Sequence, residues 1–363
     1  MRCTLRNYTK LHETSQNPSS MSDRRLIHHR FCHHFRYFLF YSLLLVLSGC
    51  ASGLQTQQLR VNPAGFPDQK ELSHTPFFPQ QQYQCGPAAL ATVLNHSGVK
   101  IDAQSLQSEI YLPSRRGSLQ IEILASTRRH NRVPYKIEPT LFALFSEITA
   151  GNPVLVLQNL GFNWAPQWHY AVVIGFNIPQ RTVILRSGME ARHMTAMDTF
   201  ELTWARSNYW GLVITAPDNL PATATAERYL RSVVDIENTT LKGRWQRVNT
   251  AYRSALTRWP NNFVAQMGVG NSAYALGDLP SASRAFRRAM NAQPEAAVAH
   301  NNLAQVLMEL GQLNEAEKYA RHAVDLGGAH MESYNETLNA IQQAQQYVLR
   351  KTEKGLKSNG GIP

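Results

Sequence analysis

The sequence is poor in cysteine and lacks the motifs that define several large classes of protein. Only four cysteines occur in 363 residues. A Gly-x4-Gly-Lys-Ser/Thr phosphate-binding loop is absent, which excludes an exporter driven by its own ATPase. No apolar run reaches the roughly 20 residues that a transmembrane helix needs. The net charge is +11, but no Lys- and Arg-rich run with interleaved aromatic residues follows residue 49, so we expect no nucleic-acid partner.

Part of the positive charge lies near the N-terminus, ahead of a short apolar stretch. Four arginines occur within residues 24–36, and the apolar residues 37–47 lead into Leu47-Ser48-Gly49-Cys50. A basic region, a short apolar region and small residues are typical of a secretory signal peptide. The last four residues resemble the bacterial lipobox. This resemblance implies a lipoprotein-type signal peptide at 1–49, lipidation of Cys50 and, because Ala51 follows, sorting to the outer membrane. Met21 is a second candidate start of translation.

Removal of that signal leaves one free thiol in the mature chain. Cys3 and Cys32 leave with the signal, Cys50 takes the lipid, and Cys85 remains. A single unpaired cysteine in an exported protein excludes a disulfide framework and is a candidate reactive group. The histidine-rich residues 28–34 have the composition of a metal cluster but belong to the discarded segment. We therefore expect no metal and no other cofactor.

Cys85 lies where a glutamine-rich loop meets an apolar, alanine-rich helix pattern. A thiol at a helix N-terminus faces unpaired backbone N–H groups and the positive end of the helix dipole, and both favour the thiolate. Gly86 lets the backbone approach a substrate closely, and Pro87 fits the first helical turn. The local sequence therefore predicts a nucleophile at Cys85.

Composition and periodicity divide the mature chain into five parts. The polar residues 50–72 are predicted to form a tether from the membrane, and a globular domain is predicted at 73–216. Residues 217–228 have the composition of a linker. Helical repeats with a capping helix are predicted at 229–348, and a flexible tail at 349–363.

The globular domain is predicted to be α+β, because helical patterns come first and β-rich runs come later. Helices are expected directly after Cys85, at 103–111, before His130 and at 141–150. Strands are expected at 133–137, 153–160, 169–176, 182–185 and 209–214.

The C-terminal part of the chain repeats with a fixed period. Pairs of equivalent residues lie 34 residues apart, namely Gly277 and Gly311, Ala282 and Ala316, and Ala289 and Ala323. This is the tetratricopeptide period, with glycine at the bend between paired helices. It predicts an all-α solenoid of three repeats at 229–262, 263–296 and 297–330. Such repeats form a concave surface suited to an extended peptide, so we expect a protein partner there.

A thiolate nucleophile needs a general base and an oxyanion site. His169 is the best candidate base, because it opens an apolar strand that holds its backbone rigidly. The other histidines considered lie near the tether, at the far ends of helices or in the repeats.

A family resemblance rests on two runs of sequence. Gln80 followed by Cys85-Gly86-Pro87-Ala88-Ala89-Leu90, and later His169-Tyr170-Ala171-Val172-Val173-Ile174-Gly175, resemble the papain-like peptidases that remove double-glycine leaders from bacteriocin precursors, in particular their stand-alone branch. The resemblance covers about 73–216, and a lipoprotein signal with tetratricopeptide repeats is similar to a known bacterial subgroup. It implies a papain-like domain with Cys85 as nucleophile, His169 as general base and acid, and an upstream glutamine as oxyanion donor. Gln80 is our choice for that donor, with Gln81, Gln82 and Gln84 as neighbouring alternatives.

One departure from the family pattern concerns the group that orients the histidine. The family usually has Asp or Asn at the end of the strand after the histidine. Here that strand ends Leu185-Arg186-Ser187-Gly188, without a carboxylate. Ser187 and Asn177 are the two candidates for the orienting role.

The sequence thus predicts a membrane-anchored cysteine peptidase that hydrolyses peptide bonds through a thioester on Cys85, with repeats that recruit a substrate or partner protein. No double-glycine specificity is assumed. The alternatives are a weak or inactive papain-like peptide-binding lipoprotein that acts in assembly or as a scaffold, a transpeptidase or amidase, and a purely structural lipoprotein. The expected location is the bacterial cell envelope, at the outer membrane facing the periplasm.

Overall fold

The computed structural model describes residues 53–63, 65–80 and 84–359, with side chains as far as residue 352. The predicted signal peptide at 1–49 and the predicted lipidation site Cys50 lie outside these ranges. Within the described ranges, no helix combines the length and the apolar character that crossing a bilayer requires.

An antiparallel sheet forms the centre of the domain that contains Cys85. Its strand order is β2-β7-β3-β4-β5-β6, and β1 pairs with β4 beside this path. The strands are β1 (Gln69–Glu71), β2 (Val133–Lys136), β3 (Val154–Asn159), β4 (Trp168–Asn177), β5 (Thr182–Ser187), β6 (Glu190–Ala196) and β7 (Gly211–Thr215). β4 carries His169 and pairs with β3 along its first part and with β1 along its last three residues. Neighbouring strands therefore hold the whole length of this strand.

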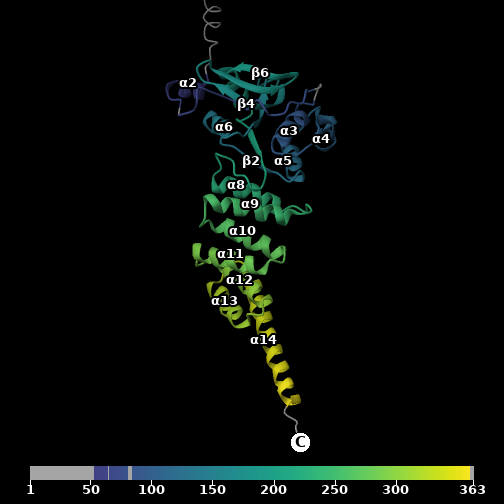
Figure 1. Ribbon diagram of the computed structural model, residues 1–363, viewed down its shortest axis with the longest axis vertical. Coiled ribbons are helices and arrows are strands. Elements are labelled where there is room, and N and C mark those ends of the chain that lie inside the picture. Colours follow the sequence, from purple (N-terminus) through teal and green to yellow (C-terminus); the bar gives the residue numbers. More distant parts are fainter. Residues whose placement is uncertain (1–52, 64, 81–83, 360–363) are drawn as a thin grey trace, which may run out of the picture. The chain divides into compact units, whose positions relative to one another are not determined.

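Side chains alternate along β3 and β4 and give the sheet two apolar faces. Leu155 and Val172 belong to the core beneath α3, whereas Val156 and Val173 pack with Phe145 of α6 on the other face. Figure 1 shows α3, α4 and α5 on one side of the sheet and α6 on the other. The helices of this domain after residue 84 are α3 (Cys85–His96), α4 (Ala103–Ile110), the short 3-10 helix η1 (Pro113–Arg115), α5 (Gln120–Arg129), α6 (Leu141–Thr149) and α7 (Met197–Ala205). The predicted α+β fold is confirmed.

The predicted tether at 50–72 is wrong over most of its length, because α2 (Leu54–Val61) and β1 fold onto the domain. The buried carboxylate of Glu201 in α7 accepts hydrogen bonds from the amides of Gln55 at 3.0 Å and Thr56 at 2.7 Å, and from the Thr56 hydroxyl at 2.7 Å. Leu59 on the same helix is buried. Polar composition suggested a free chain, but an acid distant in the sequence satisfies the first turn of α2.

Residues 217–228, predicted as a linker, are fastened to the domain. The buried carboxylate of Glu147 accepts hydrogen bonds from the amides of Ala222 at 3.1 Å and Thr223 at 2.7 Å. The Tyr135 hydroxyl donates to the Thr223 carbonyl at 2.9 Å, and α8 (Ala226–Glu237) packs on β2. The segment connects the two predicted regions, but it is not a free linker.

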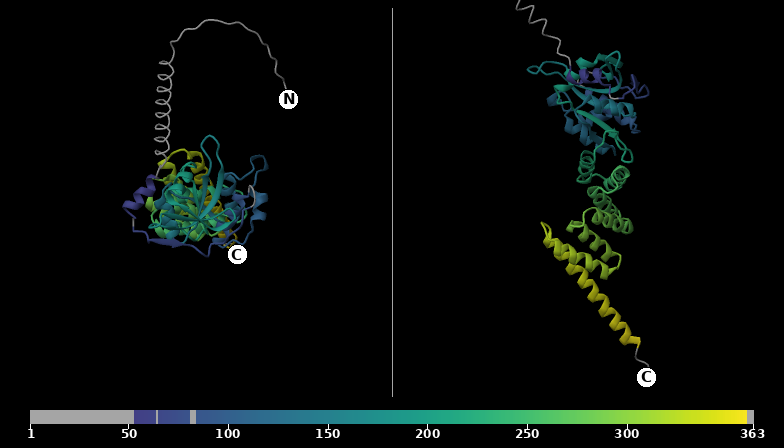
Figure 2. Two further views of the ribbon diagram at one scale, coloured as in Figure 1. Left: turned by 90° about the horizontal axis from the view of Figure 1, so that it is seen from above. Right: turned by 90° about the vertical axis from the view of Figure 1, so that its left-hand side faces the viewer.

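The repeat region consists of three helix pairs, as the sequence period predicts. The pairs are α8 with α9 (Arg244–Arg258), α10 (Phe263–Ala275) with α11 (Leu279–Ala292), and α12 (Ala297–Glu309) with α13 (Leu313–Leu326). Figure 2 shows successive helices of this region stacked on one another. Gly243, Gly277 and Gly311 lie in the turn of each pair with φ of 71°, 77° and 76°. This left-handed conformation favours glycine, so the predicted tetratricopeptide solenoid is confirmed.

The capping helix is longer than predicted. α14 spans Met331–Asn359, whereas a flexible tail was expected from residue 349. The backbone is helical through most of that predicted tail, because Leu, Arg, Lys and Glu, which are good helix formers, continue the pattern.

Candidate active site

Cys85 is the first residue of α3, and Gly86 to Leu94 of this helix are all buried. The N-terminal turn receives no side-chain cap from Gln84, so its first amides remain available to other groups. Position 86 favours glycine for a steric reason, because a Cβ there would lie 2.4 Å from the Ser118 hydroxyl oxygen. Cys85 is a free cysteine.

The protonation state of Cys85 differs from the sequence expectation. Burial raises the pKa of the Cys85 thiol, and backbone hydrogen bonds from Tyr170 and Gly86 offset only part of that increase. The helix N-terminus alone favours the thiolate, but removal of the sulfur from water favours the neutral thiol and has the larger effect. At neutral pH the resting group is therefore a thiol.

His169 lies near the start of β4 and contacts the end of β5. Its Nε2 atom lies 2.9 Å from the Ser187 hydroxyl oxygen. Burial, together with a smaller effect of the charge of His193, lowers the pKa of His169 to about 4. The imidazole is therefore neutral at physiological pH, as a general base must be. Of the two candidate orienting residues, the structure brings Ser187 to His169.

Asn177 is not beside the imidazole. It lies at the other end of β4, where its side-chain amide donates to Gln69 at 3.1 Å and its oxygen accepts from the Gln180 amide at 2.8 Å.

Gln80 is held by both ends of its side-chain amide. Its Nε2 atom donates to the Tyr170 carbonyl at 3.2 Å, and its Oε1 atom accepts from the Gly188 amide at 3.1 Å. The Gln80 backbone amide also donates to the Gly188 carbonyl at 2.9 Å. These contacts fix which end of the amide is the donor and leave one N–H of Nε2 for another acceptor.

The other glutamines of this loop fall into two groups. Gln84 donates to Gln107 of α4 at 3.2 Å, which turns its amide to a different partner. Gln81 and Gln82 lie outside the described residues. Gln80 is therefore the described loop glutamine that lies in the pocket with Cys85.

Arg186 holds the loop before Gln80 and was not identified from the sequence. Its guanidinium donates to the Thr75 carbonyl at 2.8 and 3.1 Å, to the Ser73 carbonyl at 2.9 Å and to the Ala191 carbonyl. The side chain is 9% exposed. The sequence does contain a sign of this role, because Arg186 follows the apolar residues of a predicted strand, and a buried cation needs hydrogen-bond acceptors.

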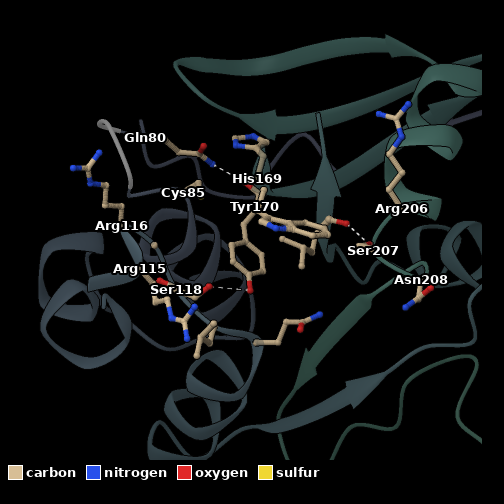
Figure 3. A pocket seen from close by; sticks show the side chains of 15 residues that line it. Gln80, Cys85, Arg115, Arg116, Ser118, His169, Tyr170, Arg206, Ser207 and Asn208 are labelled. Carbon is tan, nitrogen blue, oxygen red and sulfur yellow. Dashed lines mark hydrogen bonds between the residues drawn. The ribbon is translucent and has the colours of Figure 1, made fainter. Parts of the chain in front are cut away.

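Cys85, His169 and Gln80 line one pocket of about 800 Å³. Figure 3 shows the three side chains close together, with Tyr170 beneath them. The remaining lining residues come from the loop before α5, from β3 and β4, and from the end of α7: Arg115, Arg116, Gly117, Ser118, Leu119, Gln120, Leu157, Trp168, Tyr170, Arg206, Ser207 and Asn208. The predicted nucleophile, base and oxyanion donor thus meet in a cavity large enough for a peptide segment.

A cysteine at the start of a buried helix, facing a histidine on an antiparallel sheet, is the arrangement of the papain-like peptidases. Residues 72–212 match the model of the Peptidase_C39 like family. This part of the chain is therefore a C39-like domain, as the sequence resemblance implied. A comparison with the curated proteins finds no match.

Several solved structures are similar to parts of the chain. A putative C39-like peptidase from Bacillus anthracis is 17% identical, with 41% of this chain and 98% of that chain covered and a TM-score of 0.34. A double glycine motif protease from an AMS/PCAT transporter, in complex with the leader peptide, is 19% identical, with 40% and 93% covered and a TM-score of 0.30. The first tetratricopeptide repeat domain of Spaghetti, bound to an HSP90 peptide, is 19% identical, with 34% and 97% covered and a TM-score of 0.31.

Proposed function

We propose that this protein is a cysteine peptidase that hydrolyses peptide bonds through a thioester on Cys85. The observation that carries the proposal is the convergence of Cys85, His169 and Gln80 on one pocket. Each side chain has the chemistry that its role requires: a nucleophilic sulfur, a neutral imidazole and an amide donor fixed by other contacts.

The reaction begins with a neutral pair. As the Cys85 sulfur attacks the scissile carbonyl carbon, its proton passes to His169. The Ser187 hydroxyl contacts Nε2, so Nδ1 is the nitrogen that receives this proton. The carbonyl oxygen becomes an oxyanion, which accepts hydrogen bonds from the Cys85 amide and from the unused N–H of Gln80.

Collapse of this intermediate breaks the carbon–nitrogen bond. The His169 imidazolium gives its proton to the leaving amine, and the acyl group stays on Cys85 as a thioester. His169 then removes a proton from water, the resulting hydroxide attacks the thioester, and the Cys85 sulfur leaves and takes up a proton.

The weak point of this site is the partner of the imidazole. The Ser187 hydroxyl fixes the ring orientation but carries no charge, whereas a carboxylate would also stabilise the imidazolium. Together with the raised pKa of Cys85 and the lowered pKa of His169, this favours slow acylation. The same observation supports the second candidate function, a papain-like domain that binds peptides with little or no cleavage.

A thiol-reactive probe separates the two functions. The wild-type full chain is treated with a peptide that carries an electrophilic carbonyl, and labelling of Cys85 is followed by mass spectrometry across pH 4 to 9. An enzyme gives labelling that falls sharply in His169→Ala, while Cys85→Ala gives none. Labelling that is independent of His169, with no cleavage of any peptide in a diverse library, would support peptide binding alone.

We also propose that Cys50 anchors the protein to the outer membrane and that the repeats recruit a protein partner. The support for the anchor is the lipobox pattern, and the support for recruitment is the three-repeat solenoid. Cys50→Ala should move the full chain from the membrane fraction to the soluble fraction. Unchanged fractionation would contradict the anchor without affecting the chemistry at Cys85.

A further inference from the structure

Arginines stand on both walls of the pocket that contains Cys85. Arg115 and Arg116 come from the segment between α4 and α5, and Arg206 follows α7. Figure 3 shows Arg115 and Arg116 on one side of Cys85 and His169, and Arg206 on the other. No aspartate or glutamate lines this pocket, so its described walls carry positive charge only.

The donors of Arg206 are partly used and partly available. Its Nη1 atom donates to the Asn159 carbonyl at 3.1 Å and to the Gly161 carbonyl at 2.7 Å. These bonds fix the guanidinium at the pocket edge and account for both hydrogens of Nη1. A guanidinium has five N–H donors, so the three on Nε and Nη2 have no partner within the described part of the chain.

Arg115 is also available to a ligand. Among residues 53–352 with described side chains, ion pairs join arginines to acids at several surface positions, but none involves Arg115 or Arg206. Arginine binds carboxylates through two parallel hydrogen bonds. Two exposed arginines without an acid, placed on either side of a nucleophile, are therefore suited to carboxylates that arrive with the substrate.

We propose that this site selects peptides with acidic side chains on both sides of the bond that faces Cys85. The inference rests on the proposed peptidase function and specifies its substrate class. An acidic segment gains hydrogen bonds at both walls and is attracted from a distance by their charge, whereas a basic segment is repelled. Specificity then comes from the flanks, because the central groups act on the peptide bond that all substrates share.

The test measures peptide binding by the full-length Cys85→Ala protein, which cannot cleave its ligand. Three fluorescent peptides of equal length carry Glu, Gln or Lys at the flanking positions. We expect the Glu peptide to bind most tightly and to lose affinity with added salt. Arg115→Gln and Arg206→Gln should each weaken binding of the Glu peptide about two- to fivefold and leave the Gln peptide unchanged.

Two further variants control for structure. Arg206→Lys keeps the charge and should retain most of the preference, which separates charge from the contacts to Asn159 and Gly161. Arg231→Gln removes an exposed arginine of α8 that pairs with Glu227, and it should have no effect. Loss of Glu-peptide binding in the Arg231 variant would show that overall charge, and not the pocket, controls binding.

Equal affinity for the Glu and Gln peptides would overturn the inference. So would equally tight binding of a single-stranded oligonucleotide of the same charge, which would indicate a general anion surface. Failure of the proposed peptidase function is a separate result: it appears in the wild type as absent cleavage and His169-independent labelling, while the preference measured with Cys85→Ala persists.

Discussion

Replacement of Ser187 by aspartate should make His169 a stronger base. The Ser187 hydroxyl lies 2.9 Å from Nε2 of His169, so the substitution brings a carboxylate to the nitrogen that the serine contacts. A negative charge at this position stabilises the imidazolium that forms when Cys85 gives up its proton.

The expected size of the effect follows from the present environment. Burial lowers the pKa of His169 to about 4. An adjacent opposite charge shifts a pKa by about 1 to 3 units, so Ser187→Asp should bring the pKa of His169 to about 5 to 7. Each unit corresponds to a tenfold change in proton affinity. We therefore expect kcat/KM and the rate of Cys85 alkylation near pH 7 to rise about tenfold or more.

The assay is the pH profile of Cys85 alkylation by a small neutral reagent, with wild type, Ser187→Asp, Ser187→Asn and Ser187→Ala in parallel. Ser187→Asn has the shape of aspartate without its charge and should resemble wild type, whereas Ser187→Ala should be slower. Equal rates for the aspartate and asparagine variants would refute the reasoning, because the charge would then have no influence on the pair.

Three other predictions concern the surroundings of the pair. Gln80→Ala should lower kcat about 100-fold or more while Cys85 alkylation persists, because an oxyanion donor is lost. Gln84→Ala is the control and should leave kcat nearly unchanged, because the Gln84 side chain donates to Gln107. Arg186→Ala should lower the free energy of unfolding by about 3 kcal/mol in urea titrations, since buried carbonyls lose their donor. Arg192, which forms a largely solvent-exposed ion pair with Glu71 at 2.9 Å, is the control, and Arg192→Ala should change the free energy of unfolding by less than about 1 kcal/mol. His169 should also contribute a decrease of about 3 kcal/mol in the free energy of unfolding as pH falls from 6.5 to 4, because unfolded His169 binds a proton that the folded side chain, with its lower pKa, excludes; His169→Gln should remove this contribution.

The elements that the sequence predicts well are those whose pattern is local. The 34-residue period fixes the repeats because each copy must bury the same small residues and turn at the same glycine. Strands such as Val154–Asn159 begin with a run of four apolar residues, so the burial of that run is visible in the sequence. The segments predicted wrongly, α2 and residues 217–228, are polar and depend on the buried acids Glu201 and Glu147. Those partners are distant in the sequence, so composition alone cannot reveal them.

In the candidate site, too, the features set by local sequence pattern were predicted and those that depend on distant residues were not. Cys85, His169 and Gln80 were chosen from sequence pattern and family resemblance, and they line one pocket in the structure. The choice of Ser187 over Asn177 follows from the antiparallel register of β4 and β5, which pairs Val172 with Arg186 and leaves Asn177 at the far end of β4. Arg186 was not identified from the sequence, because its role depends on three carbonyl groups from other parts of the chain. The raised pKa of Cys85 is likewise a result of burial, which the sequence does not quantify.

The turn between β5 and β6 contacts two of the proposed catalytic residues. Ser187 contacts His169, the proposed base, and the adjacent Gly188 holds Gln80, the proposed oxyanion donor, through both its amide and its carbonyl. Both of these residues therefore contact two consecutive residues of one turn, so a displacement of that turn would disturb both. During evolution, a single change in the turn can silence the chemistry while the arginine-lined pocket and the repeats stay intact.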